Sequence, residues 1–340
     1  DCSIVPLWFR GFDANYIQQI EKYLEGGECI YIHFLTSNLL TEGGSDKHQI
    51  GLPAPKALID NGFDPDHRTV NLREVADRSH SVLPAIVWET DSVPQTWQRA
   101  YKNTPNIGGF LCSNSWNADT WQNITDKKSW VVPYSIGSLK PDPLSSIEPY
   151  ITPDKFVILS VGQWGWRKGF DVLLKAYWSE FYHQQDTLLI LKTYADIRAS
   201  KQKNNERISK DVGLIRKGLV YAGKEFSPSC RVAILPDYLS DSSMRWLHES
   251  ASLFALATRG EGYCLPAADS MFSGTPVAIT SIGGHMDFTC QESNFLIDYT
   301  EEPFSAALVY DPRHYCSVDM SVPEPSIRST REQLRGAYDE

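Results

Sequence analysis

The stretch Arg259–Pro276, RGEGYCLPAADSMFSGTP, decides the fold class of this chain. It follows the apolar run Leu253–Ala257 (LFALA) and leads into a second apolar run, Pro276–Thr280 (PVAIT). Between these runs, Pro266 suits the first turn of a helix over Leu265–Phe272. Continuous apolar strands separated by helices are typical of a parallel sheet that is covered on both faces. The stretch therefore predicts an α/β fold.

The same alternation extends over the rest of the chain. In the second half, Phe156–Val161 and Thr187–Lys192 are predicted as buried strands, with a helix over Gly169–Phe181 between them. The first half has four shorter apolar runs that are predicted as strands, namely Cys29–Leu35, Val82–Trp88, Gly109–Cys112 and Trp130–Val132. The tail is predicted as an irregular connection and then a helix from about Pro325.

A proline-rich segment, Ser138–Asp154, divides the chain. Its four prolines and small polar residues suit an extended linker between two domains. A length of 340 residues also fits two domains of ~100–200 residues each. We therefore expect an N-terminal domain over residues 1–147 and a C-terminal domain over residues 148–340. The final helix is a candidate to return to the N-terminal domain.

Composition excludes several classes of partner. The formal net charge is −10 and no basic block stands out, so nucleic acid is not expected as a partner. No apolar stretch approaches ~18 residues, so no transmembrane segment is expected. The seven cysteines lie far apart, without the spacing of a zinc site or a redox motif. We expect reduced thiols, a cytoplasmic location, no metal and no cofactor.

The first candidate site is the loop SVGQWGWRKGFD, which joins the strand at 156–161 to the next helix. Ligands of open α/β sheets bind at the carboxyl ends of strands, where helix N-termini favour phosphate. Lys168 adds a full positive charge at this place, and Arg167 precedes it. The alternative is that both are solvated loop charges. The loop is neither a Walker loop nor the dinucleotide glycine fingerprint.

The second candidate site lies in the opening stretch. Gly260 and Gly262 allow backbone amides to approach a ligand closely. Glu261 lies in the loop and Asp269 about one turn into the helix, so both carboxylates can accept bonds from sugar hydroxyls. The alternatives are a helix-dipole role for Glu261 with a solvent-facing Asp269, and a glycosidase-like acid/base pair. The glycines and the helix start favour an anionic ligand over the glycosidase pair.

The third candidate site is the segment VWETDSVP, at the carboxyl end of the apolar run 82–88. A tryptophan beside the two carboxylates of Glu89 and Asp91 suits the face of a sugar. The alternative makes Trp88 a core anchor and Asp91 the cap of a helix over Pro94–Tyr101. That alternative leaves Glu89 in need of another partner.

Together these segments resemble the retaining glycosyltransferases of family 4, which have the GT-B fold. The match runs in order from about Val82 to the C-terminus, through VWETDSVP, SVGQWGWRKGFDVLL, RGEGYCLPAADSMFSGTPVAIT and IGGHMDF. Residues 1–81 match poorly. The resemblance implies two Rossmann-like parallel-sheet domains that face each other across a cleft. The C-terminal domain then holds a nucleotide sugar, and the N-terminal domain mostly holds the acceptor.

The family motif places two glutamates around a seven-residue spacer. Glu261 matches the first, near the donor sugar hydroxyls, and Asp269 stands at the second, near the ribose. Gln163 stands where the family usually has a diphosphate arginine, and Cys264 where glycine is usual. The donor-binding residues implied by the resemblance are Gly162, Gln163, Arg167, Lys168, Glu261, Gly262, Tyr263, Cys264, Leu265 and Asp269. The catalytic candidates are Glu261, Lys168, Glu89 and Asp91.

The resemblance implies transfer of a hexose from a nucleotide-sugar donor, with retention, to a glycan, a glycoprotein or another hydroxyl acceptor. GDP-mannose is the first expected donor, and UDP-glucose and related donors come next. The cationic residues would stabilise the departing diphosphate in place of a metal. A second copy of this chain, in a homodimer, is a further candidate partner. The alternatives are a nucleotide-sugar 2-epimerase, and a nucleotide-sugar-binding protein with degenerate transferase activity.

Overall fold

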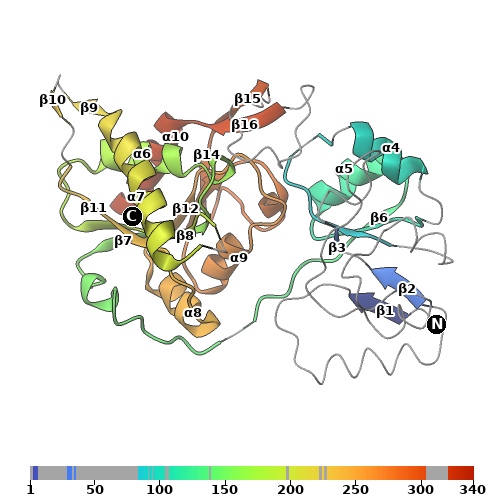
Figure 1. The fold of residues 1–340 in the computed structure, drawn as a ribbon, viewed down its shortest axis with the longest axis horizontal. Coiled ribbons are helices and arrows are strands. Elements are labelled where there is room, and N and C mark those ends of the chain that lie inside the picture. Colours follow the sequence, from blue (N-terminus) through green and yellow to red (C-terminus); the bar gives the residue numbers. More distant parts are fainter. Residues whose placement is uncertain are drawn as a thin grey trace. The chain divides into compact units, whose positions relative to one another are not determined.

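The computed structural model describes residues 83–90, 92–93, 95–103, 107–137, 139–196, 199–221, 224–225, 228–303 and 321–340, with short strands at 3–6, 29–32 and 34–35 (Figure 1). The chain forms two compact units. The first comprises Asp1–Tyr134 and Tyr315–Met320, and the second comprises Ser135–His314 and Ser321–Glu340. The domain boundary after residue 147 stays a prediction from the proline-rich segment.

The second unit is built on a parallel six-stranded sheet in the order β11-β8-β7-β12-β13-β14. Its strands are β7 (Phe156–Gln163), β8 (Thr187–Tyr194), β11 (Arg231–Leu235), β12 (Leu253–Leu256), β13 (Val277–Thr280) and β14 (Phe295–Ile297). The chain runs outward from β7 to β11, returns to β12 beside β7, and runs outward again to β14. The strand order therefore reverses between β7 and β12, the place where ligands of open α/β sheets bind.

Both faces of this sheet are covered, which explains why its strands are continuously apolar. On β8, Leu189 and Leu191 pack in the core beneath α6, whereas Leu188 and Ile190 pack in the core beneath α8 and α9. The helices are α6 (Phe170–Glu180), α7 (Lys201–Lys217), α8 (Asp241–Ser250), α9 (Leu265–Phe272) and α10 (Ile327–Asp339). Successive side chains of one strand thus serve opposite cores.

The final helix, α10, belongs to the second unit. The Ser326 side chain accepts a hydrogen bond from Ser329 N and caps the helix start. Leu334 is fully buried in the same core as α6, and Gly336 lies against the ring of Phe295 on β14. The return of this helix to the N-terminal domain stays a prediction from the sequence.

The first unit contains a parallel sheet in the order β3-β4-β5-β6. Its strands are β3 (Phe34–Leu35), β4 (Ala85–Ile86), β5 (Phe110–Cys112) and β6 (Ser129–Val131), and its described helices are α4 (Gln95–Asn103) and α5 (Ser115–Thr125). A separate parallel pair joins β1 (Ser3–Pro6) and β2 (Cys29–Ile32). The aromatic core beneath α4 and α5 is formed by Tyr101, Phe110 and Trp121.

The remaining elements are short. Among the described residues, β9 (Val220–Tyr221) pairs antiparallel with β10 (Lys224–Glu225), and β15 (Tyr299–Pro303) pairs antiparallel with β16 (Ser321–Pro325). Three single turns of 3-10 helix are η1 (Glu148–Tyr150), η2 (Trp166–Lys168) and η3 (Gly284–Asp287). Among the described residues, no helix is both long enough and apolar enough to cross a lipid bilayer.

Candidate functional site

Two loops meet at the point where the strand order reverses. One follows β7 and contains η2, and the other follows β12 and leads into α9. Gly169, at φ +61°, lies directly against the end of β12, because a Cβ built on it would stand 1.6 Å from the carbonyl oxygen of Ala257. Only glycine combines this left-handed conformation with so close a backbone approach. The sequence therefore brings both candidate loops of the second unit together.

The centre of the site is a buried ion pair between these loops. Lys168 Nζ lies 2.5 Å from Glu261 Oε1, and the two side chains are only 12% and 5% exposed. Arg167 Nη1 lies 3.4 Å from the same oxygen and donates to the carbonyl of Gly260 at 2.6 Å. Thr258 Oγ1 lies 3.1 Å from Oε1 as well. The structure thus joins three residues that the sequence predicts to act together: Arg167, Lys168 and Glu261.

Glu261 is ionised in this setting. Burial alone raises the pKa of its carboxyl, but the charges of Lys168 and Arg167 outweigh burial, and the pKa lies below its ordinary value. A carboxylate held in this form is a hydrogen-bond acceptor and cannot serve as the proton donor of a glycosidase pair. The geometry favours a role in accepting hydroxyl groups.

Some polar atoms of Lys168 and Glu261 have no partner among the described residues, and they indicate what the site can bind. All three side-chain contacts of Glu261 reach Oε1, and Oε2 receives none from the described residues. The ammonium of Lys168 has three N–H donors, of which Glu261 takes one within the described part of the chain. An acceptor oxygen and two cationic N–H groups therefore remain for a ligand.

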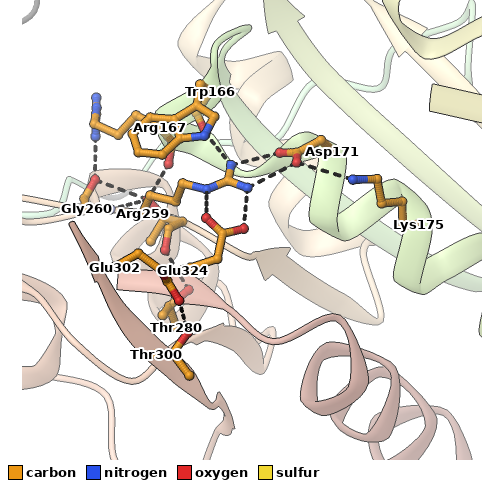
Figure 2. Close-up of polar contacts among 11 residues, drawn as sticks. Trp166, Arg167, Asp171, Lys175, Arg259, Gly260, Thr280, Thr300, Glu302 and Glu324 are labelled. Atoms are coloured by element: carbon orange, nitrogen blue, oxygen red, sulfur yellow. Dashed lines mark hydrogen bonds and ion pairs between the residues drawn. The ribbon is translucent and has the colours of Figure 1, made fainter. Parts of the chain in front are cut away.

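The side chain of Arg259 connects the loop after β12 to the loop after β7 (Figure 2). Its guanidinium forms a double hydrogen bond with Asp171 at the start of α6, at 2.8 and 3.1 Å, and another with Glu324 on β16, at 2.5 and 2.6 Å. Nη1 also donates to the Trp166 carbonyl at 2.7 Å. All five N–H groups are thus occupied. Burial opposes the charge of Arg259, but Glu324 and Asp171 raise its pKa above the ordinary value.

Sequence reasoning missed this role of Arg259. The residue begins the diagnostic stretch, yet its partners lie 88 and 65 positions away along the chain. The available signal was an arginine that closely follows a strongly apolar run, Leu253–Ala257, because a guanidinium near a buried strand needs a charged partner.

The start of α9 belongs to the same site, because it follows the loop that carries Glu261. Cys264 has φ 65° and ψ 63°, a left-handed conformation that few residues other than glycine adopt. The residue is buried, and burial, followed by the charge of Glu261, raises the pKa of its thiol. The ring of Tyr263 packs on Phe288, and Leu265 is exposed at the first turn of α9. Gly262 is buried in the same loop.

A loop after β13 completes the surroundings of Glu261. Gly284 N donates to the Glu261 carbonyl at 2.9 Å, and Gly283, at φ +124°, lies so close that a Cβ would stand 2.9 Å from the same oxygen. His285 is fully buried and donates from Nε2 to the Thr280 carbonyl at 2.7 Å. Burial lowers the pKa of His285, so its ring is neutral. The segment IGGHMDF therefore supports the site, although its residues were not among the predicted ones.

Asp269 lies apart from this pair. It is half-buried on α9, and within the described residues no hydrogen bond reaches its carboxylate. Burial raises its pKa, while Arg245 lowers it and Asp241 raises it further; both of these neighbours are on α8. Asp269 thus faces α8, and the ribose contact implied by the resemblance stays a prediction.

The remaining predicted residues of the β7 loop have different surroundings. Gly162 lies under the stem of Lys168, since a Cβ there would stand 3.2 Å from Lys168 Cδ. Gln163 is exposed at the end of β7. The cation beside Lys168 is therefore Arg167, four positions after the place at which the family usually has its arginine.

The N-terminal candidates belong to the first unit. Glu89 follows β4 and is partly exposed, and Asp91 lies outside the described residues. Trp88 is 9% exposed, packs edge-on against Trp121 and donates from Nε1 to the Ser92 carbonyl at 2.8 Å. The core-anchor interpretation of Trp88 is therefore the one that the structure supports.

Metal-binding side chains do not cluster within the described residues. No group of three or more His, Cys, Asp or Glu side chains there could hold a metal ion.

Comparisons with known proteins agree with this architecture. No family model matches the sequence. A segment of 157 residues, 46% of this chain, is 24% identical to an uncharacterised glycosyltransferase of Methanocaldococcus jannaschii and covers 35% of that protein. The chain thus matches about a third of the length of this relative.

Several solved glycosyltransferases share the fold. The pneumococcal O-GlcNAc transferase, solved with UDP and GlcNAc, matches 95% of this chain and 53% of its own length, at a TM-score of 0.51 and 12% identity. The Anabaena protein HepE, solved with UDP and glucose, matches 83% and 81%, at 0.52 and 14%. A UDP-forming trehalose-phosphate synthase of Burkholderia xenovorans matches 95% and 69%, at 0.54 and 11%. The expected fold class is confirmed: the chain has the parallel-sheet α/β fold of GT-B glycosyltransferases.

Proposed function

We propose that this protein is a nucleotide-sugar-dependent glycosyltransferase that transfers a hexose with retention. The observation that carries the proposal is the Lys168–Glu261 pair, at 2.5 Å, at the reversal point of a parallel sheet. A cation with free N–H groups suits a diphosphate, and a carboxylate oxygen without a partner among the described residues suits a sugar hydroxyl. A nucleotide sugar carries both groups next to each other.

In the proposed reaction, the bond between the anomeric carbon and the diphosphate oxygen breaks. The acceptor hydroxyl oxygen bonds to the same face of that carbon, and its proton leaves with the diphosphate. Lys168 and Arg167 stabilise the negative charge that grows on the leaving group, an effect worth about 3 kcal/mol for each well-placed donor. Glu261 orients the donor sugar. Glu89 and Asp91 stay the candidates on the acceptor side.

GDP-mannose is the donor proposed from the sequence. Two of the solved neighbours were crystallised with UDP, and a third is UDP-forming, so UDP-glucose and UDP-GlcNAc belong in the same panel. We propose a glycan or glycoprotein acceptor, a cytoplasmic location and no requirement for a metal ion. The cations of the β7 loop would replace a metal in this account.

A transfer assay tests the proposal. Purified protein is incubated with each radiolabelled donor and a mixture of glycan acceptors, in buffer with EDTA and in buffer with manganese. The expected result is transfer from one donor at the same rate in both buffers. Transfer only with manganese would contradict the metal-independent mechanism.

Incubation of each donor without an acceptor separates the alternative functions. Conversion of the donor sugar to its 2-epimer would establish an epimerase instead. Nucleotide binding without transfer or hydrolysis would establish a binding protein, a reading favoured by the departures at Gln163, Cys264 and Asp269 from the family pattern.

A further inference from the structure

Arg259 lies in the loop that carries Glu261 and reaches the turn that carries Lys168. Its backbone N donates to the Arg167 carbonyl at 2.7 Å, and its Nη1 donates to the Trp166 carbonyl at 2.7 Å. Both carbonyls belong to the turn that carries Lys168. Because Arg259 is also two positions before Glu261, it connects the two halves of the ion pair directly.

Two carboxylates hold the guanidinium in one orientation. Asp171 contributes two contacts from α6, and Glu324 contributes two from β16 (Figure 2). The guanidinium also lies 4.8 Å from the centre of the Trp166 ring. The Arg259 side chain is only 3% exposed, so water cannot replace a lost contact. Bidentate pairs fix direction as well as distance, which a single lysine ammonium cannot do.

We propose that Arg259 is a positioning residue that keeps Lys168 and Glu261 in register for the donor diphosphate, and that Glu324 of the antiparallel β15–β16 pair completes this arrangement. The inference rests on the proposed function for its ligand. If Glu324 has this role, the β15–β16 pair is part of the scaffold of the donor site, although it lies far along the sequence from the stretch Arg259–Pro276. Arg259 itself has no free N–H group for the ligand.

Glu324→Gln tests the inference by the direction of its effect. The substitution removes a negative charge near an anion site, so long-range electrostatics alone would tighten the binding of a nucleoside diphosphate. Loss of one of the two bonds to Arg259 would loosen it instead. Glu302→Gln is the matched control, because Glu302 lies on the neighbouring strand β15, is exposed and has no contact with Arg259 among the described residues.

The probes are UDP and GDP, titrated by calorimetry at a temperature at which every variant is folded. We expect Glu324→Gln to lower the affinity by about tenfold or more, because small displacements of binding groups have effects of this size. Glu302→Gln should leave the affinity unchanged or slightly higher. An affinity of Glu324→Gln equal to or above that of the wild type would overturn the inference.

Hydrogen exchange gives a readout that needs no ligand. In Arg259→Lys, the peptides that cover residues 164–169 and 258–264 should exchange faster than in the wild type. Arg335→Lys is the control, because Arg335 donates to Glu180 at the opposite end of α6, at 2.8 Å. Wild-type exchange rates in both loops of Arg259→Lys would overturn the positioning role. Faster exchange in Arg259→Lys, together with a wild type that binds neither UDP nor GDP, would support the positioning role and contradict the proposed function.

Discussion

Among single residues, the buried contact between Lys168 and Glu261 carries the proposed function. A buried pair is not in itself a strong source of stability, because both charges lose water when the chain folds. Removal of one partner is costly, since it leaves the other charge buried and unpaired. The presence of such a pair in the loops that follow two strands is therefore better explained by ligand binding than by stability.

The depressed pKa of Glu261 predicts how the stability of the protein depends on pH. A carboxyl whose pKa is lower in the folded state adds stability above its unfolded pKa of about 4.3. This contribution is lost as the pH falls toward the lower folded value. The free energy of unfolding of the wild type should therefore fall more steeply on acidification than that of Glu261→Gln, as measured by urea denaturation at several pH values. Parallel profiles would contradict an ionised, paired Glu261.

The left-handed backbone of Cys264 predicts a difference between two substitutions. Alanine keeps the strain at φ 65°, whereas glycine adopts this conformation freely. Both remove the buried thiol. Cys264→Gly should therefore be more stable than Cys264→Ala by about 1 kcal/mol, as measured by the urea midpoint. Equal stabilities would show that the loop relaxes to another conformation.

The sequence predicts the chemistry of Glu261, Arg167 and Lys168 because each lies within a few positions of a strand end. It does not predict the clamp around Arg259, because Asp171 and Glu324 reach it only through the folded sheet. The ribose contact of Asp269 is implied by the resemblance and stays a prediction; its side chain lies near the charges of Arg245 and Asp241 on α8.

At the scale of elements, apolar runs predict the strands of the second unit well. Phe156–Val161 and Thr187–Lys192 fall inside β7 and β8, because these strands are buried on both faces and are therefore continuously apolar. The run Val82–Trp88 contains only the two-residue strand Ala85–Ile86. An apolar run indicates that its residues are buried, but it does not show that they form a strand. Trp88 is buried without belonging to a strand.

Strand β16 shows a second limit of sequence patterns. Its sequence, SVPEP, has two prolines and is predicted as an irregular connection. Proline has no N–H for a ladder, but it is tolerated in edge strands. Strand β16 pairs only with β15 among the described strands, so its prolines can occupy an edge. The strand places Glu324 beside Arg259.

The close approach of α6 to β12 predicts the effect of one glycine substitution. Gly169→Ala places a methyl group against the Ala257 carbonyl and forces a positive φ on alanine. We expect a loss of about 3 kcal/mol or more in the free energy of unfolding. Gly165→Ala is the control, since its Cβ would meet no atom within 4 Å and its backbone is extended. Similar losses for both variants would contradict the loop packing.

At the scale of the whole molecule, fold and function rest on different observations. The parallel sheet, its order and the solved neighbours establish the GT-B fold. Identities of 11–14% to these neighbours leave the activity to the site itself. The fold class can be predicted from the sequence because the order of the motifs indicates the order of the strands. The identities of the donor and of the acceptor depend on side chains outside those motifs.

A calorimetric titration of the purified chain with UDP and with GDP tests whether the site around Lys168 and Glu261 binds a nucleoside diphosphate. The wild type should bind one of them in the presence of EDTA. Lys168→Ala should weaken that binding by about tenfold or more, because a charge-assisted hydrogen bond is lost. Lys155→Ala, at the opposite end of β7, should bind like the wild type. Absence of binding to either nucleotide, or an unchanged affinity of Lys168→Ala, would contradict the account.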